Sequence, residues 1–154
     1  MNHSLRILPL LLTAMFASCT PAKSEQMSKN AFNEYEILDS QKVSWSEILR
    51  QKELIYLVFF YSETCPHCHE IIGDVLAFSN ENIVPTYFLD IKKQETKVPI
   101  KNEITETIGA TSIDGLFIMG TPSIVEVENA TVIANVAGKD SCLTLLNEQR
   151  LAHK

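Results

Sequence analysis

The sequence predicts an α/β fold in which a central mixed sheet has a parallel βαβ half and ends in a β-hairpin plus a helix. The apolar run Leu54 to Tyr61 is typical of a strand that is buried on both faces. A helical pattern, Glu70 to Phe78, and a second apolar run, Ile83 to Ile91, follow it, and this order makes a βαβ unit with parallel strands. Two strand-like segments, Ser123 to Glu128 and Thr131 to Ala137, then indicate an antiparallel hairpin.

Two elements are expected before the first of these strands. The segment Tyr35 to Leu38 is a short strand candidate. Ser44 to Glu47 has the S-x-x-E form of a capping box, which predicts the start of a helix with Trp45, Ile48 and Leu49 on one face. With the βαβ unit included, the predicted order is therefore strand, helix, strand, helix, strand.

The other elements follow from spacing and from breaks in it. Pro66 suits the first turn of the helix that follows the long apolar run. Lys92 to Lys101 is polar and rich in lysine, so we expect an exposed loop there, and Glu103 to Ala110 fits a short helix. Asp140 to Leu151 is predicted to be the last helix, and Cys142 on its apolar face is expected to be buried.

The N-terminal residues have the pattern of an export signal. Ile7 to Ala17 is an apolar run of eleven residues, too short to span a bilayer comfortably, and it leads into Ala17-Ser18-Cys19. This ending resembles the lipobox of bacterial lipoproteins, and the resemblance implies cleavage before Cys19, lipidation of Cys19 and attachment to the bacterial cell membrane. The alternative is a plain secretory signal, which would leave the protein secreted or periplasmic. We therefore expect a signal peptide of the lipoprotein type over residues 1–18, a flexible tether over 19–31 and a folded domain over 32–154.

Composition and charge exclude some classes of function. The chain of 154 residues has 45% hydrophobic residues, enough for a globular core, and a net charge of −6 without a basic cluster, so nucleic acid is not an expected partner. Outside the cytoplasm disulfides can persist, and enzymes that act on them are needed there. With Cys19 lipidated, three thiols remain, and this odd number argues against a scaffold of several disulfides.

The pair Cys65 and Cys68 is the strongest functional signal. A Cys-x-x-Cys pair between a strand and a helix is the arrangement of a redox dithiol. Cys65 would lie at the amino end of the helix, where unpaired N–H groups and the helix dipole stabilise a thiolate. Cys68 would lie one turn further in and be less exposed. We therefore expect Cys65 to attack a substrate sulfur and Cys68 to resolve the mixed disulfide, with no metal or other cofactor.

The same letters allow two other interpretations. Cys65 to His69 is also a C-x-x-C-H string, which can mark covalent attachment of haem. It also places four sulfur and nitrogen ligands within five residues, as a zinc site needs. The βαβ context is unexplained by haem, and side chains so close together on one helix cannot all point at one tetrahedral metal centre.

Gly120-Thr121-Pro122, directly before the final hairpin, and Gly138 before the last helix complete a pattern that resembles the thioredoxin family. The resemblance covers Tyr35 to Leu151. It implies a thioredoxin-like fold, a cis peptide bond before Pro122 and an extended substrate that binds to the backbone of Thr121.

Two features around the dithiol concern the direction of the reaction. Pro66-His67 is the dipeptide of strongly oxidising disulfide-forming enzymes, and His67 is expected to stabilise the Cys65 thiolate. The chain departs from those enzymes because it lacks their large helical insertion. It also has Phe59 and Thr64 where the thioredoxin family usually has a buried acid and a tryptophan. Proton transfer from Cys68 is therefore left without an evident carboxylate.

Together these patterns predict an extracytoplasmic, membrane-anchored thiol–disulfide oxidoreductase. Its expected partners are protein substrates that contain cysteine and a second protein that recycles the dithiol. His67 and the export signal favour an oxidase or isomerase. A pathway-specific disulfide reductase and an accessory protein of bacteriocin export are alternatives within the same chemistry. A peptide-binding module, in which Cys65–Cys68 is only a structural disulfide, is the alternative of another class.

Overall fold

The computed structural model describes residues 41–153. The signal peptide and tether predicted for residues 1–31, the lipidation site Cys19 and the strand predicted at Tyr35 to Leu38 lie outside the described residues. Among residues 41–153, no helix has the length and apolar character to cross a membrane.

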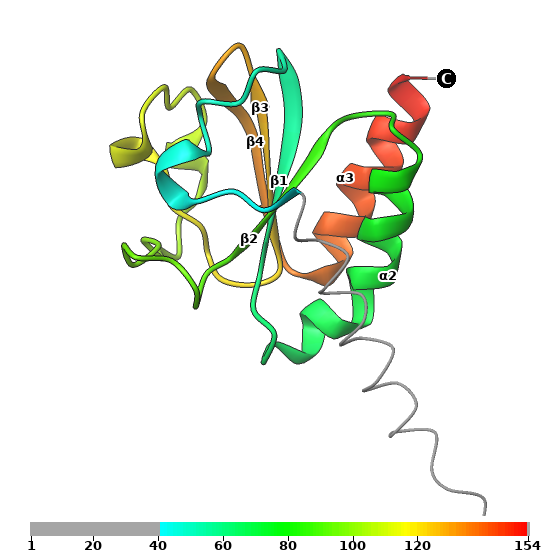
Figure 1. Cartoon of the computed structure of the whole chain (residues 1–154), viewed down its shortest axis with the longest axis horizontal. Coiled ribbons are helices and arrows are strands. Elements are labelled where there is room, and N and C mark those ends of the chain that lie inside the picture. Colours follow the sequence, from blue (N-terminus) through cyan, green and yellow to red (C-terminus); the bar gives the residue numbers. More distant parts are fainter. Residues whose placement is uncertain (1–40, 154) are drawn as a thin grey trace, which may run out of the picture.

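The centre of the fold is a mixed four-stranded sheet in the order β2-β1-β3-β4 (Figure 1). Strand β1 (Ile55–Tyr61) runs parallel to β2 (Thr86–Asp90) and antiparallel to β3 (Ser123–Glu128), which pairs with β4 (Thr131–Ala137) in a hairpin. The central position of β1 explains why nearly all of its side chains are buried. The predicted mixed sheet with a parallel half and a C-terminal hairpin is confirmed.

Both long helices cover the same face of the sheet (Figure 1). Helix α2 (Pro66–Asn80) makes the crossover between β1 and β2, and α3 (Lys139–Ala152) follows the hairpin and packs beside α2. Their apolar positions at helical spacing meet alternate residues of the strands in one buried cluster. The larger members of this cluster are Phe59, Tyr61, Ile71, Ile72, Val75, Phe78, Phe88 and Leu146.

Short turns and loops cover the opposite face. A second buried cluster there contains Trp45, Phe60, Val98, Leu116 and Val125, among others. These side chains come from β1, β3 and the irregular segments before β1 and after β2. The two faces of one sheet are therefore closed in different ways, one by helices and one by loops.

The helix predicted to start at Ser44 is wrong in length. The amide and the hydroxyl of Ser44 both donate to the carboxylate of Glu47, at 3.2 Å and 2.6 Å. Only a three-residue 3-10 turn, Trp45–Glu47, follows. The hydroxyl of Tyr56 donates to the carbonyl oxygen of Ile48 at 2.7 Å. That oxygen is one that a continuing helix would bond to its own backbone.

The helix predicted over Glu103 to Ala110 is also reduced to a 3-10 turn, Thr105–Thr107. The amide of Gly109 donates to the carbonyl oxygen of Val132 at 2.8 Å. The amide of Val132 donates in turn to the carbonyl oxygen of Ala110 at 2.9 Å. This backbone pairs with the outer edge of β4 instead of continuing a helix. Gly109 has φ of +87°, a conformation in which glycine carries no steric penalty.

Candidate dithiol site

The dithiol lies where β1 ends and α2 begins. Cys65 is the N-cap residue of α2 and Pro66 is its first helical residue, as expected. The amide of Cys65 donates to the carbonyl oxygen of Ser62 at 3.0 Å, which turns the chain from the strand into the helix. Cys65 therefore lies at the amino end of a helix, where the sequence places it.

The sulfur of Cys65 has several polar neighbours. It accepts a hydrogen bond from the amide of Cys68 at 3.3 Å and lies 3.2 Å from the carbonyl oxygen of Thr121. Burial alone would raise the pKa of this thiol. Hydrogen bonds from the thiol and amide of Cys68, the side chain of Thr121 and the amide of His67 outweigh burial, so the pKa lies below its ordinary value. Cys65 therefore ionises more readily than a free cysteine.

Cys68 is in the opposite situation. It is fully buried in the cluster between α2 and the sheet. Burial, followed by its hydrogen bond to Cys65, raises the pKa of Cys68 to about 12. Cys68 is therefore a protonated thiol at neutral pH and a hydrogen-bond donor to Cys65. The two sulfurs are chemically distinct, as the roles of attacking and resolving cysteine require.

Alkylation of the reduced native protein should follow this difference. We expect the rate at which iodoacetamide modifies Cys65 to decline at a lower pH than the rate for a free cysteine does, because the pKa of Cys65 lies below its ordinary value. Cys68 and Cys142 should stay unmodified, because both are buried and burial raises the pKa of each to about 12. Peptide mapping by mass spectrometry across a pH series measures the three rates separately. Equal rates at Cys65 and Cys68 would contradict the assignment.

Thr121 and Pro122 lie beside the dithiol. The peptide bond between them is cis, as the family resemblance implies. The carbonyl oxygen of Pro122 accepts a hydrogen bond from the amide of Gly138 at 2.8 Å, and the hydroxyl of Ser123 donates to the carbonyl oxygen of Gly120 at 2.7 Å. These contacts fix the start of β3 against the start of α3 and hold Thr121 next to Cys65.

The two histidines of the motif do not converge with the cysteines. His67 is exposed, and its Nδ1 lies 3.3 Å from Oε1 of Glu70. The Nε2 of His69 lies 2.6 Å from the carbonyl oxygen of Glu63 and can donate to it. Within residues 41–153, no three His, Cys, Asp or Glu side chains are placed to hold a metal ion.

Phe59 fills the position at which the family usually has a buried acid. It is fully buried, stacks on Tyr61 with ring centroids 6.0 Å apart and meets the edge of Phe88 at 6.1 Å. Within residues 41–153, the structure buries two carboxyl groups that the sequence did not reveal. Asp90 accepts a hydrogen bond from the amide of Lys92, and Glu126 accepts one from Gln149 at 2.9 Å.

The ionisation of Glu126 is perturbed by its surroundings. Burial raises its pKa, and its hydrogen bond from Gln149 opposes that rise. Asp90 pairs in register with Tyr61, at the end of β1 that leads to the dithiol. Glu126 pairs with Leu57, further from that end. The partners of Asp90 and Glu126 depend on pairing between distant strands and on the packing of α3, and the local sequence predicts neither.

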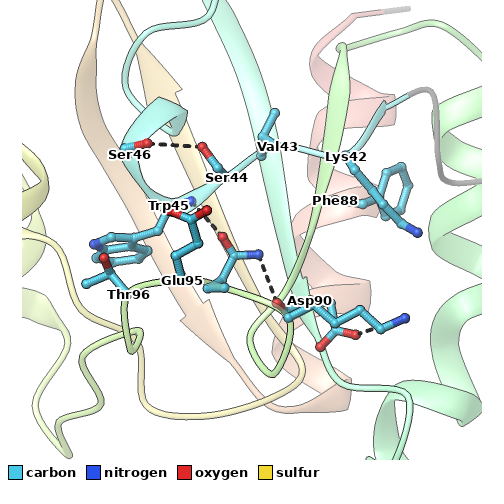
Figure 2. Close-up of a pocket in the computed structure, with 11 residues that line it drawn as sticks. Lys42, Val43, Ser44, Trp45, Ser46, Phe88, Asp90, Glu95 and Thr96 are labelled. Atoms are coloured by element: carbon cyan, nitrogen blue, oxygen red, sulfur yellow. Dashed lines mark hydrogen bonds and ion pairs between the residues drawn. The ribbon is translucent and has the colours of Figure 1, made fainter.

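A polar hollow of about 500 Å³ lies between the segment before β1 and the loop after β2 (Figure 2). The side chain of Gln94 joins its two walls, because it accepts from the amide of Trp45 at 2.8 Å and donates to the carbonyl oxygen of Asp90 at 3.0 Å. Lys93 from the same wall forms an ion pair with Glu63 in the dithiol loop. This ion pair links one wall of the hollow to the dithiol loop, although no cysteine lines the hollow.

Solved structures with the thioredoxin fold resemble this chain. Mitochondrial thioredoxin 3 from Saccharomyces cerevisiae is 12% identical, with a TM-score of 0.51 over 75% of this chain and 94% of that one. A second protein with a thioredoxin fold is 15% identical, with a TM-score of 0.50 over 73% of this chain and 96% of that one. No protein-family model and no curated protein sequence matches the chain. The likeness shows that the chain has the thioredoxin fold.

Proposed function

We propose that the protein is a thiol–disulfide oxidoreductase whose redox centre is Cys65 and Cys68. The observation that carries the proposal is the difference between the two sulfurs. Cys65 is partly accessible and its pKa is lowered by donors, whereas Cys68 is buried, protonated and within reach of Cys65. A cysteine pair with only a structural role needs no such difference.

The reaction is an exchange of two electrons between dithiols and disulfides. The Cys65 thiolate attacks one sulfur of a substrate disulfide, forms a mixed disulfide and releases the other substrate sulfur as a thiolate. Cys68 then passes its proton to the released substrate thiolate and attacks the sulfur of Cys65, which releases the second substrate sulfur as a thiolate. The substrate is reduced and the pair is oxidised to a disulfide. The same steps in reverse oxidise a substrate dithiol.

The hydrogen bonds of the thiolate support the oxidising direction. The Cys65 thiolate accepts from both the amide and the thiol of Cys68, and closure of the disulfide removes the thiol donor. Interactions that exist only in the reduced state favour that state, and a dithiol with a favoured reduced state is an oxidant. On this ground the proposed role is that of an oxidase or isomerase.

The proposed setting follows from the N-terminal pattern. Export and a lipid on Cys19 would place the domain outside the cytoplasm, on the bacterial cell membrane, where disulfides persist. The proposed substrates are proteins that contain cysteine, bound in extended form along the backbone of Thr121. A second redox protein would return the dithiol to its working state.

Equilibration with glutathione tests the proposed function. The protein is incubated in buffers of graded glutathione ratio, and the reduced fraction is read by alkylation and mass spectrometry. We expect the Cys65–Cys68 pair to titrate at a potential above about −300 mV, because structural disulfides lie below that value. A pair that stays oxidised at lower potentials would be structural, and the peptide-binding alternative would replace the enzyme.

A further inference from the structure

His67, Glu70 and Lys139 form a chain of polar contacts beside the dithiol. The Nδ1 of His67 lies 3.3 Å from Oε1 of Glu70, one turn further along α2. The other carboxylate oxygen, Oε2, accepts a hydrogen bond from Nζ of Lys139 at 2.6 Å. Lys139 is the first residue of α3, which lies beside α2 (Figure 1). One carboxylate therefore connects the histidine of the motif to the second helix.

The carboxylate in this chain is ionised at neutral pH. The hydrogen bond and the charge of Lys139 lower the pKa of Glu70, and His67 adds a smaller effect in the same direction. Lys139 lies at the amino end of α3, where the helix dipole disfavours a cation. A carboxylate partner offsets that unfavourable position. The contact with Lys139 thus directs the Glu70 carboxylate toward α3 and favours its ionised form.

The imidazole of His67 contacts this carboxylate instead of the Cys65 sulfur. The donors to Cys65 are the amide and thiol of Cys68, the side chain of Thr121 and the backbone amide of His67. An imidazolium next to a thiolate would stabilise the thiolate further and lower the pKa of the thiol. In this structure that additional stabilisation is absent, because the His67 ring is bound to Glu70.

We propose that Glu70 is a positioning residue that keeps the His67 imidazole off the Cys65 thiolate and thereby limits the oxidising power of the dithiol. Lys139 has the supporting role of holding Glu70. This inference rests on the proposed function and adds a regulator of its strength: the pair is a weaker oxidant than the same four-residue motif with an unrestrained histidine.

The substitution Glu70→Gln tests the inference. It removes the negative charge and releases the imidazole, and both changes stabilise the Cys65 thiolate. We expect the equilibrium constant for oxidation of glutathione by the disulfide to rise about tenfold, which is about 30 mV for a two-electron couple. We also expect the thiolate absorbance of Cys65 to persist to lower pH than in the wild type.

Two controls separate release of His67 from simple removal of charge. Glu63→Gln removes another carboxylate of the same segment, one that pairs with Lys93 and not with His67, so its effect should be clearly smaller. In a His67→Gln background, Glu70→Gln should have only this smaller effect. An effect of Glu70→Gln that is equal with and without His67 would overturn the proposal.

Nuclear magnetic resonance of the His67 ring gives an independent readout. In the wild type, the ring signals should barely change between the reduced and the oxidised protein, because the ring contacts Glu70. In Glu70→Gln they should shift with the redox state. If the pair did not exchange with glutathione at all, the proposed function would fail, while the thiolate titration and the ring signals would still decide the role of Glu70. Unchanged titration and unchanged signals in Glu70→Gln would refute it.

Discussion

Replacing Cys65 with serine should reduce thiol–disulfide exchange by at least about a thousandfold, because a hydroxyl is a far weaker nucleophile than a thiolate at neutral pH. Replacing Cys68 with serine should have a different result. Cys65 retains its helix N-cap position and the donor amide of residue 68, so it still attacks a disulfide. Without Cys68 the mixed disulfide has no intramolecular route to resolution, so the protein should stay attached to its substrate.

Mass spectrometry after incubation with a peptide disulfide distinguishes these outcomes. The Cys65→Ser protein should show no added mass, and the Cys68→Ser protein should carry one peptide. Cys142→Ser is the matched control, because Cys142 is buried on α3, and it should retain exchange. Multiple turnovers by Cys68→Ser would contradict the assigned roles.

The same trapping variant reports the direction of the reaction in cells. Proteins bound to Cys65 in Cys68→Ser can be isolated, and their redox state in wild-type cells can then be measured. An oxidase predicts partners that carry disulfides in the wild type. Partners that are reduced in the wild type would replace the oxidase proposal with a reductase.

The second large effect is on stability. Phe59→Ala should lower the free energy of unfolding by about 3–5 kcal/mol, the usual cost of removing a buried phenylalanine ring from a core. Phe59 lies in the central strand and is fully buried, and it contacts the rings of Tyr61 and Phe88. Neighbours in a close-packed strand cannot collapse into the space that its ring leaves.

Urea unfolding of both proteins measures this difference. Leu54→Ala is the control, because Leu54 directly precedes β1 and is 71% exposed, so its effect should stay within about 0.5 kcal/mol. A loss below 1 kcal/mol for Phe59→Ala would mean that the packing around β1 is loose.

The strands and long helices were predictable because local patterns determine them. The apolar run of β1 and the helical spacing of α2 each specify one element without help from distant residues. The hairpin bounds also agreed with the sequence, although Asn129 and Ala130 both adopt positive φ in its turn. The two predicted helices that do not form are replaced by tertiary contacts. The hydroxyl of Tyr56 makes the contact in one case, and the edge of β4 makes it in the other.

The candidate site divides in the same way. The motif specified Cys65 and Cys68, and the order of strands brought Pro122 beside them. The surroundings could not be predicted, because Glu70 and Lys139 are 69 residues apart in the chain and meet only through the packing of α2 on α3. The sequence suggested a role for His67 at the thiolate, but it could not show that a carboxylate one turn away would bind the ring.

The unequal cover of the two faces of the sheet has a consequence for local opening. Local unfolding that exposes backbone amides needs the least free energy where irregular segments and short turns cover a sheet. It needs the most in well-packed helices. The loops between β2 and β3 should therefore exchange their amide hydrogens first, while α2, α3 and β1 form the late-exchanging unit. Cys68 and Cys142 both lie within that unit. The buried thiol of Cys68 should therefore stay shielded from dissolved oxidants while the loops on the opposite face open.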